Sequence, residues 1–106
     1  MQILFDQGTP WPLRHYLAGH TIHRALQLGW DRDADGLLIA RAEEAGYELL
    51  ITTDQNIQYQ QNLAILKIAI LVLVDHNWPY NQASIDPIVA AVETATEGSY
   101  LEIKVQ

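Results

Sequence analysis

Three aspartates occupy positions where a parallel α/β sheet would gather them. Asp6 directly follows the apolar run 3–5, Asp54 follows a strand-like stretch that ends at Thr52, and Asp35 opens a helical segment. Ligands bind beyond the carboxyl ends of the strands in such sheets, so these acids should share one edge. Crowded carboxylates either raise a pKa or hold a divalent cation. Ligation by oxygen alone favours Mg²⁺ or Mn²⁺, and three acids at one edge predict a metal or catalytic role. For a single acid the favoured role is structural, as a helix cap for Asp35 and a turn residue for Asp54.

Strand-forming and helix-forming segments alternate along the whole chain. The expected strands cover residues 3–5, 21–26, 48–52, 68–74 and 100–105. The expected helices cover residues 12–18, 37–45, 57–63 and 85–96. This alternation is typical of right-handed βαβ units. It predicts one α/β domain over residues 1–106, with three layers and a mainly parallel central sheet of about five strands flanked by helices.

The charge balance of the chain is strongly acidic. Six basic residues face thirteen acidic ones, the net charge is -7, and there is no cysteine. Disulfides and thiolate metal sites are therefore excluded, and a stand-alone nucleic-acid binder is disfavoured. A nuclease whose acids hold a metal is not disfavoured by this charge. Scattered solvated charge is favoured over a basic patch for the four arginines of the first half, Arg14, Arg24, Arg32 and Arg41.

No segment of the sequence has the length of a membrane span. The longest apolar stretch, 63–74, is interrupted by Lys67 and falls short of the ~20 residues that cross a bilayer. The N-terminus has no basic region and reaches Asp6 at once, unlike a signal peptide. We expect a cytoplasmic protein with no membrane contact.

Two other metal-site patterns are weaker. The segment Asp31–Gly36 matches the opening of a calcium loop, but the position that needs a bidentate glutamate carries Ala42, so a helix-capping loop is favoured. The pair His20 and His23 lacks a third ligand within sequence reach, which disfavours zinc. Packing rather than base stacking is the favoured role of the tryptophans Trp11, Trp30 and Trp78.

Several motifs, in their order and spacing, resemble one known family. They are Ile3-Leu4-Phe5-Asp6-Gln7-Gly8-Thr9-Pro10, Gly19-His20-Thr21, Gln27-Leu28-Gly29-Trp30, Asp35 with the helix after it, and Leu49-Leu50-Ile51-Thr52-Thr53-Asp54-Gln55-Asn56-Ile57. Together they are similar to the small PIN-like domain family of bacteria, compact relatives of PIN-domain ribonucleases and VapC-type toxins. The resemblance covers nearly the whole chain.

The resemblance implies a PIN-like fold and Mg²⁺- or Mn²⁺-dependent cleavage of RNA, with an antitoxin protein as a further expected partner. In this reading Asp6, Asp35 and Asp54 hold the metal and Asn56 assists catalysis. The residues expected to orient substrate or water are Gln7, Thr52, Thr53 and Gln55. Independently, the apolar excess of so small a chain predicts a homodimer or a hetero-complex.

Two alternatives to an active nuclease stay open. Gln7 stands where relatives often carry glutamate and Asn56 replaces a signature aspartate, and each change removes one negative charge. An inactive PIN-like interaction module accommodates both changes. A signalling receiver would use Asp6 and Asp54, but it wants a hydroxyl after the fourth strand and a lysine after the fifth. Here Asp75 follows the fourth strand, and Lys104 lies inside the last.

Overall fold

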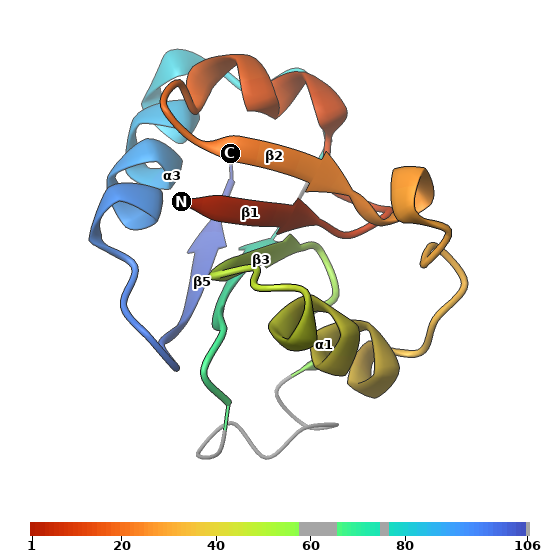
Figure 1. Ribbon diagram of the computed structural model, residues 1–106. Helices are drawn as coiled ribbons and strands as arrows, with labels where there is room; N and C mark the ends of the chain where they lie inside the picture. Colours follow the sequence, from red (N-terminus) through yellow and green to blue (C-terminus); the bar gives the residue numbers. More distant parts are fainter. Residues whose placement is uncertain (58–65, 75–76, 106) are drawn as a thin grey trace.

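The computed structural model describes residues 1–57, 66–74 and 77–105 (Figure 1). Its elements are β1 (Gln2–Phe5), the 3-10 helix η1 (Trp11–Tyr16), β2 (Thr21–Arg24), the 3-10 helix η2 (Ala25–Leu28), α1 (Asp35–Glu44), β3 (Leu49–Thr52), β4 (Ala69–Val74), α3 (Gln82–Thr94) and β5 (Tyr100–Lys104). The alternation of strands and helices expected from the sequence is confirmed.

The five strands form one parallel sheet in the order β2-β1-β3-β4-β5. The chain therefore places β2 on one side of β1 and every later strand on the other. This reversal makes the gap between β1 and β3 the topological switch point, where ligands bind in open α/β sheets. The register pairs Phe5 with Arg24 on one side and with Ile51 on the other.

Alternate residues of each central strand belong to two separate hydrophobic cores, one on each face of the sheet. On one face, Ile3, Leu49 and Ile51 pack with residues of η1 and α3. On the opposite face, Leu4 and Leu50 pack with residues of α1. Figure 1 shows the same arrangement, with η1 and α3 on one side of the sheet and α1 on the other. The three-layer α/β architecture with a five-stranded parallel sheet is thus confirmed.

Element boundaries differ from the sequence-based expectation most clearly in three elements. The helix expected over 12–18 is a 3-10 helix ending at Tyr16. The second strand ends at Arg24, because the chain turns there into η2. Helix α3 begins at Gln82, three residues earlier than expected, because the Asn81 side chain accepts a hydrogen bond from the Ser84 amide and caps its first turn. The helix expected over 57–63 falls mostly outside the described residues.

Within the described ranges, no helix has both the length and the apolar character that crossing a bilayer requires.

Gly46 ends α1 and allows the chain to turn into β3. Its φ of 89° lies in the left-handed region, and no other atom would obstruct a Cβ there. The cost of a side chain at this position is therefore conformational. We expect Gly46→Ala to lower the free energy of unfolding by about 1 kcal/mol. Gly46→Asn should lose less, because asparagine tolerates this conformation. Urea denaturation of both variants measures the difference, and equal stabilities would contradict it.

Candidate carboxylate site at the sheet edge

The three predicted aspartates lie at the carboxyl edge of the sheet. Asp6 follows β1, and Asp54 follows β3, the strand beside it. Asp35 is the first residue of α1, which the chain enters from the carboxyl end of β2. The acids therefore flank the switch point between β1 and β3. Asp75, which follows β4 in the sequence, lies outside the described residues.

Asp35 and Asp54 are in direct contact. A hydrogen bond joins their side chains, so one carboxyl group donates a proton to the other. Burial, this hydrogen bond and the negative charges of Asp54 and Asp6 raise the pKa of Asp35 to about 7. The hydrogen bond from Asp35 lowers the pKa of Asp54. Asp35 is therefore the proton donor near neutral pH, and the charge of Asp6 extends to this pair.

The Thr52 hydroxyl connects the other two acids. Its Oγ1 donates a hydrogen bond of 2.8 Å to Oδ2 of Asp6 and accepts one of 3.1 Å from the backbone N–H of Asp54. Thr52 is 0% exposed, so neither bond competes with water. A substrate-orienting role was expected for this residue. Its burial instead gives it the task of fixing Asp6 and the turn that carries Asp54.

Backbone amides complete the environment of the two acids. Oδ1 of Asp6 accepts a hydrogen bond from the Gln7 amide, and Oδ1 of Asp54 accepts one from the Asn56 amide. The side chains of Gln7, Gln55 and Asn56 are exposed at this edge. Their expected roles toward substrate stay predictions.

Two residues that hold the edge together were not anticipated. Thr9 is buried, and its hydroxyl donates a 2.7 Å hydrogen bond to the carbonyl of Ile51, which ties the loop after β1 to β3. Gly8 packs so closely on Thr53 that an added Cβ would stand 2.5 Å from the threonine Oγ1. This contact places Thr53 against the backbone of the same loop. The Gly8-Thr9 pair after a strand-ending acid was the available sequence signal.

The other candidate metal ligands serve other contacts. Oδ2 of Asp33 lies 2.9 Å from Nε of Arg41, which fixes the acidic loop to α1. His20 contacts the N-terminal amine and Glu93, whereas His23 contacts the Tyr47 hydroxyl. These residues take protein partners at separate places.

The donor set at the carboxylate edge fits a hydrated hard cation. Among residues 1–57, 66–74 and 77–105, no group of three or more His, Cys, Asp or Glu side chains is close enough to hold a metal ion directly. Magnesium, however, is commonly bound through one or two carboxylates and keeps several waters. The Asp35–Asp54 pair supplies the two carboxylates, and Asp6 adds negative charge. Such an ion would take the place of the shared proton.

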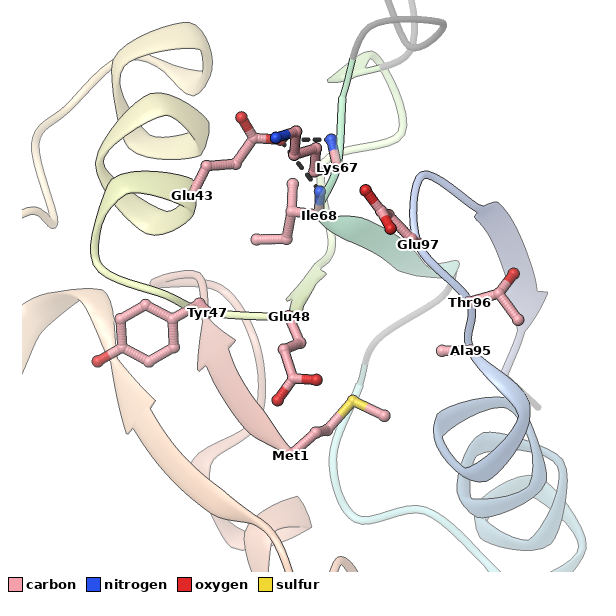
Figure 2. Close-up of a pocket in the computed structure, with 9 residues that line it drawn as sticks. All are labelled: Met1, Glu43, Tyr47, Glu48, Lys67, Ile68, Ala95, Thr96 and Glu97. Atoms are coloured by element: carbon pink, nitrogen blue, oxygen red, sulfur yellow. Dashed lines mark hydrogen bonds between the residues drawn. The ribbon is translucent and has the colours of Figure 1, made fainter.

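A hollow lined by acidic side chains lies at the opposite edge of the sheet. It has a volume of about 270 Å³, and Figure 2 shows Glu43 and Glu48 among its walls. Oε1 of Glu43 accepts hydrogen bonds of 2.7 and 3.0 Å from the amides of Lys67 and Ile68. Oε1 of Glu48 accepts one from the Gln2 amide. These acids cap the amino ends of strands, so size alone does not make this hollow the reactive site.

Comparisons with known proteins add no constraint to this geometry. No protein-family model, no curated protein and no solved structure matches the chain. The function must therefore be argued from the carboxylate edge itself.

Removing the Thr52 hydroxyl should disturb the site and the fold together. Thr52→Val keeps the side-chain volume but removes both hydrogen bonds, and we expect it to lower the free energy of unfolding by about 1–3 kcal/mol. Thr52→Ser keeps the hydroxyl and should lose less. Thr94→Val is the matched control, since the Thr94 hydroxyl bonds a carbonyl on the exposed side of α3. Urea denaturation compares the three, and equal losses in Thr52→Val and Thr94→Val would contradict the assignment.

The raised pKa of Asp35 makes stability depend on pH. The folded state binds this proton more tightly than the unfolded chain, so its contribution is complete below the ordinary pKa of 3.8 and disappears as the pH rises through about 7. Asp35→Asn keeps a hydrogen-bond donor for Asp54 without the charge. It should match wild type near pH 3 and exceed it at pH 8 by on the order of 1 kcal/mol, a value that allows for solvent screening.

Thermal melts at both pH values test this expectation. Asp86→Asn, an equivalent change on the exposed surface of α3, should show no such dependence on pH. A loss of stability in Asp35→Asn at pH 8 would show that the two carboxylates do not oppose each other there.

Proposed function

We propose that this protein is a metal-dependent ribonuclease that uses Mg²⁺ or Mn²⁺ at the carboxylate edge. The observation that carries the proposal is the direct contact of Asp35 with Asp54 at the switch point, within the electrostatic reach of Asp6. Three acids gathered where open sheets bind ligands are an arrangement that costs stability unless a cation or proton neutralises them. The family resemblance of the sequence motifs points to the same chemistry.

In this mechanism Asp35 and Asp54 would hold the cation, and Asp6 would add negative charge from the end of β1. A bound divalent ion supplies an activated water and neutralises charge on the scissile phosphate. Asp35 must release the proton it shares with Asp54 before both carboxylates can ligate. Thr52 keeps Asp6 in place throughout, because its hydroxyl has no solvent to exchange with. The exposed Asn56 and Gln55 contact substrate or ordered water, and Gln7 does so from the loop after β1.

The competing proposal is an inactive PIN-like interaction module. It is supported by Gln7 and Asn56, which supply amides where related proteins often carry acids. An amide oxygen ligates a hard cation but attracts it less than a carboxylate does. The two proposals differ in whether the remaining acids bind metal, and a metal titration separates them.

Two features favour a signalling receiver and two others disfavour it. The strand order is the flavodoxin-like one, and Lys104 ends β5 at the carboxyl edge. However, Asp75 and His76 follow β4 in the sequence, so no hydroxyl is available there. Asp54, which would accept the phosphoryl group, is hydrogen-bonded to Asp35. The nuclease therefore accounts for more of the site than a receiver does.

The proposed partners are an RNA substrate, an antitoxin-like protein and a second copy of the chain. Four large apolar side chains are about half exposed and come from different elements: Tyr16, Leu26, Leu37 and Leu101. We expect sedimentation of the purified chain, alone and after co-expression with the product of the neighbouring gene, to show a species heavier than the 12.0 kDa monomer.

Two substitutions at the edge test the nuclease proposal. Asp54→Asn removes a charge from the Asp35–Asp54 pair, and we expect it to abolish both Mn²⁺ binding and cleavage of an unstructured RNA. Asn56→Asp adds a carboxylate and should tighten Mn²⁺ binding, by about tenfold if one more charge contacts the ion. Calorimetric titration gives the affinities, and an RNA cleavage assay with and without EDTA gives the activity.

The pH dependence of binding is the internal control. Because Asp35 keeps its proton up to about pH 7, Mn²⁺ should bind wild type more tightly at pH 8 than at pH 6. Equally weak Mn²⁺ binding by wild type and both variants would contradict the proposed metal site. Binding that strengthens in Asn56→Asp without any RNA cleavage would favour the interaction module.

A further inference from the structure

Two arginines share one tryptophan beside the carboxylate edge. The guanidinium carbon of Arg14 lies 4.5 Å from the centroid of the Trp11 ring, and that of Arg24 lies 4.9 Å from it. Trp11 is itself held edge-on against Phe5, with ring centroids 5.8 Å apart and planes at 90°. The ring is therefore a fixed support that two positive charges share.

The sheet register places this arginine pair next to the acids. Arg24 ends β2 and pairs with Phe5, the residue immediately before Asp6. Trp11 opens η1 at the end of the short loop that follows Asp6. The pair thus belongs to the same carboxyl edge as the carboxylates, on the side of β2. The sequence reading, which favoured scattered solvated charge, did not foresee this cluster.

Neither guanidinium has an acidic partner in the described part of the chain. Arg41, by contrast, is paired with Asp33. Arg14 donates through Nη1 to the Trp11 carbonyl, and Nε of Arg24 is buried without an acceptor among the described residues. Two positive charges on one ring, with no acidic partner, favour the binding of an anion. This is unexpected in a chain of net charge -7, where carboxylates are abundant.

We propose that Arg14 and Arg24 form the subsite that holds the phosphodiester backbone of single-stranded RNA, an inference that rests on the nuclease function proposed above. The planar guanidinium matches the geometry of phosphate oxygens, and two of them can hold one phosphate or two successive phosphates. Because the guanidinium groups cover the ring of Trp11, the subsite contacts the backbone and not a base. It therefore binds strands independently of sequence and brings the neighbouring phosphate to the acids.

A binding assay without metal tests the subsite separately from cleavage. Fluorescence anisotropy follows a labelled oligouridylate in EDTA at low salt. We expect Arg14→Gln/Arg24→Gln to bind about tenfold or more weakly than wild type and to lower the salt dependence by about two phosphate contacts. Lys67→Gln/Lys104→Gln is the matched control, because it removes the same charge from the amino edge and from β5. Equal losses in the two double variants would overturn the proposal.

A second measurement uses the unmodified protein, so it does not depend on how well a variant folds. In an NMR titration with the same oligonucleotide, the Nε–Hε signals of Arg14 and Arg24 should shift, whereas that of Arg41 should not. Unchanged Arg14 and Arg24 signals at saturating RNA, or no RNA binding at all, would overturn the subsite. RNA binding that depends on the two arginines, without cleavage in Mn²⁺, would support the subsite and contradict the nuclease function.

Discussion

The mutual repulsion of three carboxylates at the β1–β3 switch point is the constraint on which this site depends. In the folded protein, one proton and one hydroxyl group reduce this repulsion. Asp35 keeps a proton that it shares with Asp54, and Thr52 binds Asp6 while it holds the Asp54 turn. Both devices are local and come from residues that face each other only because β1 and β3 are neighbours. The same repulsion that costs stability in the empty site would favour a divalent cation.

The two ends of the sheet use acidic side chains in opposite ways. At the amino edge, Glu43 and Glu48 accept backbone N–H groups of neighbouring strands, so their charges stabilise the start of the sheet. At the carboxyl edge, the backbone donors are fewer than the carboxylate oxygens, and the acids turn toward each other. Acids at the amino edge are therefore satisfied by the backbone, whereas those at the carboxyl edge depend on one another.

Positive charge is distributed as unevenly as negative charge. Only six basic residues are present, and two of them are held on Trp11 at the edge of β2. The guanidinium groups contact the ring face, so most of their N–H donors stay available to an anion. An acidic protein with a local pair of this kind repels nucleic acid over most of its surface and attracts it at one place, beside the carboxylates.

The sequence alone determined the alternation of strands and helices, the parallel sheet and the edge to which Asp6, Asp35 and Asp54 belong. These follow from apolar periodicity and from the rule that acids after parallel strands share an edge. Tertiary structure decided the strand order, the burial of Thr52 and the proton shared by Asp35 and Asp54. It also decided that Arg14 and Arg24 contact the same Trp11 ring. Each of these depends on pairing between residues distant in sequence, and on side-chain directions that periodicity does not encode.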